Sequence, residues 1–303
     1  MKPTSKGVVV ACVLTVSTAI ASPSAQELDA LKKIKATNTF TIGHRDVSMP
    51  FSYFDDKQHP IGYSMDLCMR IVDALKTTQK APKLDVKLRP VTAANRIPLL
   101  ANGTVDIECG ATTNTIERQQ QVSFVTTTFV AATRLAWKKS AKFTSLNDLK
   151  DKTVVAVAGT TNLRQITEAN SQRGLRLTIV PAKHHNDAFA MLEKGEAAAF
   201  ASDDILIYGM IANAAAPADY AVSSDALSVE PYGIMVRKDD KGLKKVADDT
   251  IRALFKSGEI DKIYAKWFLS PIPPKNVVLN APMSDALKKV IAKPTDSGNP
   301  NDY

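Results

Sequence analysis

Strand patterns alternate with amphipathic helix patterns over most of this chain, and this order restricts its fold more than any other feature. Residues 39–42 and 84–88 alternate apolar and polar side chains as half-buried strands do, and residues 105–109 form a third strand. Helix patterns separate the strands: one begins at Ser64, a suitable cap, and another covers 95–101. Because parallel strands need helical crossovers, this order predicts a parallel sheet flanked by helices.

The same order recurs in the second half of the chain. Residues 153–158 form a continuous apolar strand, Gly159 begins a turn into a helix, and strands over 175–180 and 197–201 enclose another helix at 187–193. We therefore expect two α/β lobes of similar design, each a mostly parallel sheet flanked by helices.

Two apolar, strand-like stretches connect the halves, at 128–137 and 230–236. Two connectors running in parallel, rather than one linker, indicate that the chain leaves the first lobe, builds the second and returns. Helix patterns at 243–257 and 260–268 would then cover the first lobe. The expected lobes are residues 26–133 with 231–279 (lobe 1) and residues 134–230 (lobe 2).

The first 25 residues have the layout of a secretory signal peptide. Lys2 and Lys6 precede an uncharged apolar run at 7–20, and small residues follow, with cleavage expected near Ala21 to Ala25. No other run of about 18 apolar residues occurs. We therefore expect an exported protein with a periplasmic location.

The end of the chain has a different composition. The segment 271–274, which contains three Pro, should end the regular structure. Residues 280–303 then form a C-terminal extension, and its last ten residues are rich in Asp, Asn, Ser and Pro. Such a composition predicts a frayed end.

The basic charge of the chain is a weak guide to function. There are 39 Lys and Arg against 31 Asp and Glu, and loss of the signal peptide removes two Lys, leaving 37 against 31. The basic residues are spread in pairs and aromatic residues make up only 6%, whereas nucleic-acid-binding proteins usually concentrate Lys and Arg in one stripe with stacking aromatics. We therefore expect no nucleic-acid partner.

Two cysteines, Cys68 and Cys109, remain after cleavage, and an oxidising compartment permits a disulfide between them. The sequence does not distinguish that disulfide from two buried free thiols. No CxxC pattern occurs and the four His are scattered. We therefore expect no metal site and no cofactor.

Three arginines lie where ligands gather in open parallel sheets, at the carboxyl ends of strands or the starts of the following helices. They are Arg45, Arg96 and Arg118. A single Arg at such a place is usually solvated or ion-paired, and Arg118 could pair with Glu117. Because a guanidinium matches a carboxylate or phosphate with two hydrogen bonds, three converging Arg predict a site for an anion.

Other strand ends carry Thr161, His185 and Asp203. Thr160 and Thr161 begin a helix, where they could bind an anion or simply cap the helix, and the pair Asp203-Asp204 could likewise cap the helix that begins near Ile205. His184 and His185 would usually form an exposed pair. An Asp cannot help to bind an anion but can bind an ammonium group, so three Arg with one Asp suit a zwitterion that carries an extra carboxylate.

Several motifs together resemble the periplasmic glutamate/aspartate-binding proteins of bacterial ABC importers, which are family 3 polar amino acid solute-binding proteins. The resemblance extends from about residue 28 to 276. The motifs are His44-Arg45, Pro50-Phe51-Ser52-Tyr53, Asn95-Arg96-Ile97-Pro98, Glu108-Cys109-Gly110, Thr112-Thr113-Asn114 and Glu117-Arg118-Gln119.

The resemblance implies a two-lobed flytrap that is joined by two hinge strands and closes on one amino acid. In this family, Arg118, Thr113 and Thr161 would hold the α-carboxylate of the ligand. Asp203 and the backbone near Ala111 would take its α-ammonium group. The implied protein is a monomeric carrier that delivers L-glutamate or L-aspartate to an inner-membrane ABC permease.

The side-chain carboxylate of the ligand would lie among Arg45, Arg96 and His185. Two departures from the family affect this region: Ala93 stands where the family commonly has a Ser that contacts the distal carboxylate, and His184 replaces a usual Asp. The loss of one neutral hydrogen bond costs about 0.5–1.5 kcal/mol, so an acidic amino acid is still expected, without a choice between glutamate and aspartate. The alternatives are a binder of another polar amino acid and an enzyme on the same scaffold, such as a dehydratase acting on a small carboxylic acid.

Overall fold

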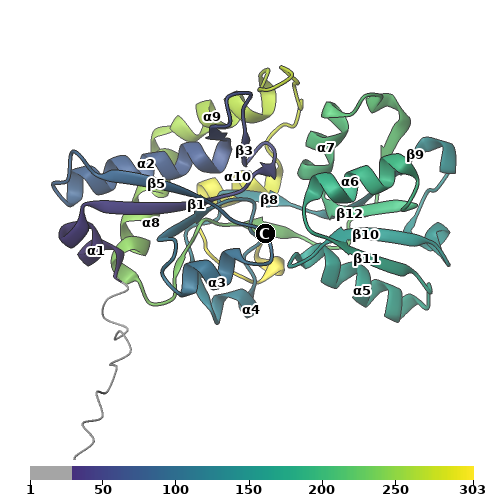
Figure 1. Cartoon of the computed structure of the whole chain (residues 1–303), viewed down its shortest axis with the longest axis horizontal. Coiled ribbons are helices and arrows are strands. Elements are labelled where there is room, and N and C mark those ends of the chain that lie inside the picture. Colours follow the sequence, from purple (N-terminus) through teal and green to yellow (C-terminus); the bar gives the residue numbers. More distant parts are fainter. Residues whose placement is uncertain (1–28) are drawn as a thin grey trace, which may run out of the picture.

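Two five-stranded sheets stand at opposite ends of an elongated molecule, and helices cover both faces of each (Figure 1). The computed structural model describes residues 29–303, so the expected signal peptide lies outside the described residues. The strand order is β5-β1-β6-β15-β7 in lobe 1 and β11-β10-β12-β9-β13 in lobe 2. This arrangement confirms the predicted fold class.

The elements have the following bounds. The strands of lobe 1 are β1 (Thr39–His44), β5 (Asp85–Pro90), β6 (Ile107–Cys109), β7 (Val122–Phe124) and β15 (Met235–Arg237), with a small antiparallel sheet of β2 (Val47–Ser48), β3 (Ser52–Phe54) and β4 (Pro60–Ile61). Its helices are α1 (Ala30–Thr37), α2 (Tyr63–Thr78), α3 (Arg96–Ala101), α4 (Ile116–Gln119), α8 (Lys241–Ser257), α9 (Glu259–Tyr264) and α10 (Asp285–Ala292).

The strands of lobe 2 are β9 (Thr133–Lys138), β10 (Thr153–Val157), β11 (Thr178–Ala182), β12 (Ala199–Asp203) and β13 (Tyr220–Val222). Its helices are α5 (Thr161–Arg173), α6 (His185–Lys194) and α7 (Asp204–Asn213). In each lobe the second strand in this order pairs in parallel with both neighbours: β1 with β5 and β6, and β10 with β11 and β12.

Strand β10 is apolar and buried from Val154 to Val157, because both faces of its sheet are covered. Val155 and Val157 pack on one face with residues of α6, such as Phe189. Val154 and Ala156 pack on the other face with residues of α5. Burial on both sides is typical of parallel sheets with helical crossovers.

The core of lobe 1 is built around an aromatic cluster. Phe129 stacks on Phe268 with ring centroids 5.1 Å apart, and Phe51 meets Phe129 edge to face at 5.0 Å. The apolar face of α2, including Leu67 and Ile71, packs into the same core. Such pairs stabilise a core beyond the area that they bury.

Two short strands, β8 (Phe129–Ala131) and β14 (Glu230–Tyr232), connect the lobes and pair with each other. The pairing is antiparallel, so the expectation of connectors running in parallel was wrong. The chain leaves lobe 1 along one strand and returns along the other, which requires opposite directions. Each predicted stretch is also divided, because the chain passes from the hinge pair into a sheet of one lobe, at β9 and at β15.

The end of the chain is ordered, so the prediction of a frayed C-terminus was wrong, as was the end of regular structure at 271–274. Helix α10 packs Leu287 and Val290 into the core of lobe 1. Beyond it, Thr295 accepts a hydrogen bond from the Thr127 amide at 2.8 Å, and the Tyr303 hydroxyl lies 2.7 Å from that of Thr127. Composition alone did not reveal these tertiary contacts.

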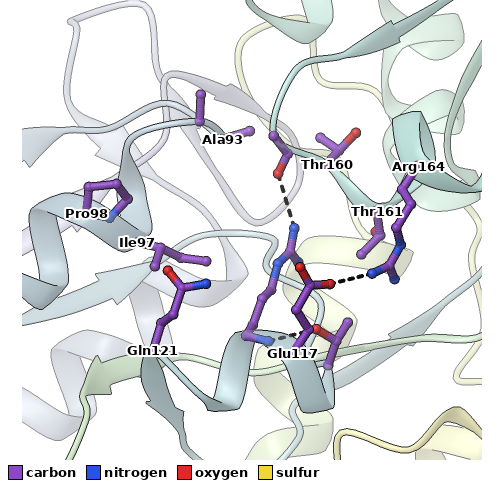
Figure 2. Close-up of a pocket in the computed structure, with 12 residues that line it drawn as sticks. Ala93, Ile97, Pro98, Glu117, Gln121, Thr160, Thr161 and Arg164 are labelled. Atoms are coloured by element: carbon purple, nitrogen blue, oxygen red, sulfur yellow. Dashed lines mark hydrogen bonds and ion pairs between the residues drawn. The ribbon is translucent and has the colours of Figure 1, made fainter.

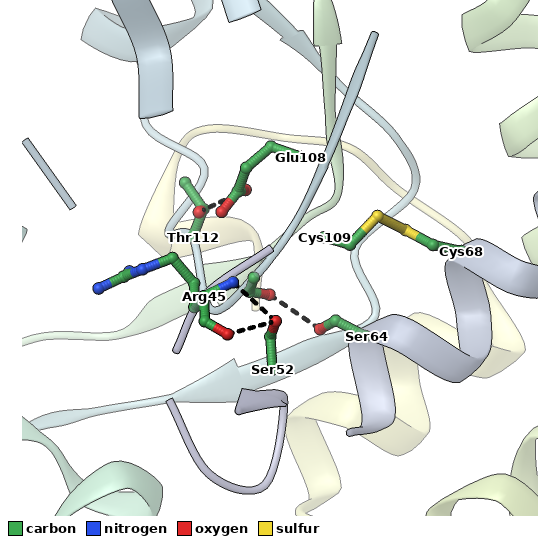
Figure 3. Close-up of a disulfide and its surroundings, with 8 residues drawn as sticks. Arg45, Ser52, Ser64, Cys68, Glu108, Cys109 and Thr112 are labelled. Carbon is green, nitrogen blue, oxygen red and sulfur yellow. Dashed lines mark hydrogen bonds between the residues drawn. A yellow bond between two sulfur atoms is a disulfide. The ribbon is translucent and has the colours of Figure 1, made fainter. Parts of the chain in front are cut away.

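A disulfide joins Cys68 of α2 to Cys109 at the end of β6, which settles the alternative that the sequence left open (Figure 3). Ser64 lies beside it and donates a hydrogen bond to the Gly110 carbonyl at 2.8 Å, so its predicted role as a helix cap was wrong. The helix begins earlier because Gly62, with φ of 137°, makes the turn into it.

Candidate functional site

The carboxyl ends of the parallel strands of both sheets meet between the lobes. Thr113, beyond β6, and Thr161, beyond β10, have hydroxyl oxygens 3.4 Å apart. The Arg118 guanidinium of lobe 1 donates to the Gly159 carbonyl of lobe 2 at 3.1 Å. The lobes are therefore in contact, and the predicted site residues lie at their interface.

The three predicted arginines are all buried there, with 1% of Arg45, 2% of Arg96 and 9% of Arg118 exposed. Within the part of the chain that the structure describes, Nε and Nη2 of Arg45 and Nε of Arg96 are buried without hydrogen-bond partners. Burial, then the charge of Arg96, lowers the pKa of Arg45 to about 10. The pKa of Arg118 falls to about 9 for the same two reasons. An anion placed among these groups would accept hydrogen bonds from the unpartnered nitrogens and would stabilise the buried positive charges.

The Arg118 side chain is fixed by backbone carbonyls on both sides of the interface. Its Nη1 donates to the Thr113 carbonyl at 2.8 Å, and its Nη2 donates to Gly159. The alternative that Arg118 pairs with Glu117 is wrong. Glu117 instead accepts from Arg164 of lobe 2 at 2.6 Å, which Figure 2 shows as a bridge across the cleft.

This cleft has a volume of about 390 Å³ and opens along the seam between the lobes (Figure 2). Arg118, Thr161 and Ala93 line it. The other predicted residues do not line it; they are buried in the interface between the lobes. They are Arg45, Arg96, Ala111, Thr113, His185 and Asp203.

Asp203 ends β12 and is 4% exposed. It accepts hydrogen bonds from Asn162 Nδ2 at 2.7 Å and from the Tyr232 hydroxyl. Burial, then the neighbouring Glu230, raises the pKa of Asp203 to about 7. The Asp203 side chain makes no cap hydrogen bond to the next helix, so the cap interpretation is wrong for this residue. The other member of the pair, Asp204, accepts from the Ile205 amide at 2.8 Å.

His185 opens α6 and is buried, whereas His184 is partly exposed. Burial, followed by the charges of Arg45 and Arg96, holds the pKa of His185 well below its usual value. Its imidazole is therefore neutral at pH 7, and its Nδ1 is buried without a partner among residues 29–303. The expectation of an exposed pair was wrong for His185, because its helix begins at the interface.

Thr160 and Thr161 have different roles at the start of α5. The Thr160 hydroxyl accepts from the Leu163 amide at 3.2 Å, so the interpretation as a helix cap is confirmed for this residue. The Thr161 hydroxyl donates to Glu230 at 2.7 Å and faces Thr113. Helix N-termini have unpaired amides and a positive dipole end, which favour an anion.

Two buried acids near the arginines were missing from the predicted site. Glu108 is fully buried, accepts from Thr112 at 2.8 Å, and its charge raises the pKa values of Arg45 and Arg96 against the effect of burial (Figure 3). Glu230 of the hinge is 1% exposed. A lone acid within the apolar strand Ile107-Glu108-Cys109 was the available signal for the first. Glu230 had no such signal, because the hinge folds it against α5.

The Ala111 carbonyl accepts from Arg96 Nη1 at 3.1 Å, and the same nitrogen donates to Thr112 at 2.7 Å. The preceding Gly110 has no room for a side chain, because a Cβ there would lie 2.2 Å from Glu108 Oε1 and 2.9 Å from Arg45 Cγ. The loop beyond β6 therefore packs directly against the two arginines.

Within residues 29–303, no group of three or more His, Cys, Asp or Glu is arranged to hold a metal ion. The same residues contain no helix that is both long and apolar enough to span a membrane.

Comparison with known proteins identifies the family. Residues 40–270 match the model of the bacterial extracellular solute-binding proteins, family 3. The chain is 51% identical over 267 residues to the L-glutamate/L-aspartate-binding protein of Pseudomonas aeruginosa, and 45% identical over 266 residues to the glutamate/aspartate import solute-binding protein of Escherichia coli, with 88% of each chain covered in both cases. The structure resembles the crystal structure of the P235GK mutant of ArgBP from T. maritima, with a TM-score of 0.70, 28% identity, and 78% and 98% of the two chains covered.

These relatives are binding proteins and not enzymes, which supports a carrier over the alternative of a dehydratase. The sequence match, the two lobes and the buried polar site between them agree with one another. The chain therefore belongs to the family 3 bacterial extracellular solute-binding proteins.

Proposed function

We propose that this protein captures L-glutamate or L-aspartate between its lobes and delivers it to an inner-membrane ABC permease. A cleaved signal peptide exports the protein to the periplasm, where it acts. The observation that carries this proposal is the convergence of Arg45, Arg96 and Arg118, with unpartnered buried donors, on an interface that also holds Asp203. The names of the relatives at 51% and 45% identity support the choice of ligand.

In the proposed complex, the α-carboxylate binds Arg118, Thr113 and the start of α5 at Thr161. The α-ammonium group binds Asp203 and the carbonyl side of the loop at Ala111. A bound cation would stabilise the ionised form of Asp203, which burial and Glu230 otherwise disfavour.

The side-chain carboxylate binds Arg45, Arg96 and the neutral His185. Ala93 is buried beside α3 and offers no hydroxyl to this carboxylate. A change of Ala93→Ser would restore one neutral hydrogen bond, so affinity for the preferred ligand should rise by up to roughly tenfold.

Closure is the proposed mechanism of capture. One moving lobe consists of residues 29–133 and 231–279, together with the C-terminal segment 280–303 that packs on it, and residues 134–230 form the other, with β8 and β14 as the hinge. Ligand contacts made by both lobes favour the closed form, because a ligand shifts a conformational equilibrium only through its different affinity for the two states.

Calorimetric titration of the purified, ligand-stripped protein tests the proposal. Glutamate or aspartate should bind, and Arg118→Ala and Asp203→Ala should each remove most of the affinity. Arg89→Ala is the matched control, because Arg89 is an exposed arginine of the same lobe. Absence of binding of both amino acids at about 1 mM would refute the choice of ligand.

Two further measurements address the partners. Sedimentation at the mass of one chain would support a monomer. Deletion of the gene in its host should lower the uptake of radiolabelled glutamate or aspartate, and unchanged uptake of both would contradict delivery to a permease.

A further inference from the structure

The segment 295–303, which we call the strap, returns across lobe 1 to the loop and helix that carry Arg118. The Asp296 carbonyl accepts from Asn114 Nδ2 at 2.8 Å and from Gln119 Nε2 at 2.9 Å. Asn114 and Gln119 also bond to each other at 2.9 Å. One carbonyl of the strap therefore holds both ends of the 114–119 segment.

The strap is itself anchored to the body of lobe 1. Its Asp296 carboxylate lies 2.8 Å from Lys244 Nζ of α8. Thr127 bonds to Thr295 and Tyr303 near the two ends of the strap. Figure 1 shows the C-terminus near the middle of the molecule, between the two sheets.

Contact with α4 is close along the strap. Gly298 is buried, and a Cβ there would lie 2.7 Å from the Ile116 amide nitrogen and 2.8 Å from the Thr115 carbonyl carbon. Both neighbours are backbone atoms, so they cannot move aside as a flexible side chain would. A branched side chain at position 298 would push the strap away from α4.

Helix α4 depends on such support, because it has only four residues and isolated helices of that length are unstable. Its other supports include the Thr115 cap and the Asn114 amide, which donates to Pro231 of the hinge at 2.7 Å. Lys238 Nζ also donates to the Gln119 carbonyl, and Arg164 bridges to Glu117. Arg118 lies within the 114–119 segment, and its Nη1 donates to the carbonyl of Thr113, the residue just before that segment.

We propose that the strap is a positioning element that fixes Arg118 and Thr113 for the α-carboxylate of the ligand. The strap lies outside residues 40–270, the part matched by the family model. The proposal rests on the role assigned above to Arg118. When the 114–119 segment is ordered before the ligand arrives, part of the entropic cost of binding is already met. For the two side chains Arg118 and Thr113, this predicts a loss of affinity of about tenfold when the strap is removed.

The test compares the full chain with a chain that ends at Lys293, which keeps α10 and lacks the strap. A second variant, Gly298→Val, displaces the strap in the full chain and serves if the shortened chain does not fold. The control is Asn301→Ala, because Asn301 is exposed on the strap. Calorimetry should give a Kd for glutamate or aspartate about tenfold higher in the first two variants and unchanged in the control.

Combination with Arg118→Lys separates positioning from general destabilisation. If the strap acts through Arg118, its removal in the Arg118→Lys protein should cost little further affinity. An equal loss in both backgrounds, or an unchanged Kd without the strap, would overturn the proposal.

Hydrogen exchange of the ligand-free protein gives a readout that does not depend on the ligand. Amides of residues 115–119 should exchange faster without the strap, while those of α2 should not. Unchanged exchange in α4 would refute the proposal even if the amino acids bind, whereas faster exchange in a protein that binds neither amino acid would refute only the proposed function.

Discussion

Gly159 offers a direct test of whether lobe closure determines affinity. It has φ of 78°, and a Cβ built on it would lie 2.7 Å from the Cα and 2.8 Å from the nitrogen of Ala94. Gly159 belongs to lobe 2 and Ala94 to lobe 1, so the overlap exists only when the lobes meet. Gly159→Ala should therefore destabilise the closed form and leave the open form able to fold.

The expected loss follows from the cost of overpacking. A methyl group forced against rigid backbone costs about 1–3 kcal/mol, which corresponds to a roughly 5- to 150-fold higher Kd. The left-handed backbone adds a cost for any residue with a Cβ, but that cost applies to open and closed forms alike.

Gly174→Ala is the matched control. Gly174 is in the same lobe with φ of 59°, and a Cβ there meets nothing within 4 Å. Both variants should lower the melting temperature of the ligand-free protein by similar amounts, and only Gly159→Ala should weaken binding of glutamate or aspartate in calorimetry. If the two variants bind the ligand equally well, contact at Gly159 does not limit closure and the reasoning fails.

Three further predictions concern charge and covalent support. Because the pKa of Asp203 is raised to about 7, lowering the pH through 7 should protonate its carboxylate and weaken ligand binding. The stability of the ligand-free protein should fall as the pH rises from about 4 to 7, since the native state holds a proton in that range that the unfolded state has lost. Calorimetric titrations and denaturant curves over a pH series check both, and Asp203→Asn should flatten both pH dependences. Loss of the Cys68–Cys109 disulfide, which closes a loop with a sequence separation of 41, should cost about 4 kcal/mol of unfolding free energy, measured from urea curves of the double Ser variant; an unchanged midpoint would contradict this. The Glu117–Arg164 bridge is largely exposed, so Arg164→Gln should raise Kd by at most about fivefold, and the effect should vanish in 1 M salt.

The fold was predictable because its signals are local. The apolar residues of β10 show that both of its faces are buried, and the four-residue spacing of Leu67, Ile71 and Leu75 shows which face of α2 is buried. In each case the information lies within one element. The hinge pairing and the strap were not predictable in this way. Their contacts join residues that lie far apart in the sequence, such as Ala131 and Glu230 in the hinge and Asn114 and Asp296 in the strap.

Part of the site was also predictable, for a related reason. A strand in a parallel sheet delivers the residue after it to a common edge, so Arg45 and Asp203 could be placed from strand ends alone. Glu230 could not, because it lies on a hinge strand and reaches the site through tertiary contacts with lobe 2, where it accepts from Thr161.

The sequence by itself determined the two α/β lobes, the three arginines and the resemblance to a family, because each depends on short-range pattern or on residue type. Only the tertiary structure decided the ionisation of the site. Burial and charged neighbours from other elements raise the pKa of Asp203 to about 7 and lower the pKa of His185, which keeps its imidazole neutral at pH 7. The structure likewise decided that the cysteines are joined and that the end of the chain supports α4. Electrostatic energies and long-range contacts depend on distances in space, and the order of residues along the chain does not specify those distances until the chain has folded.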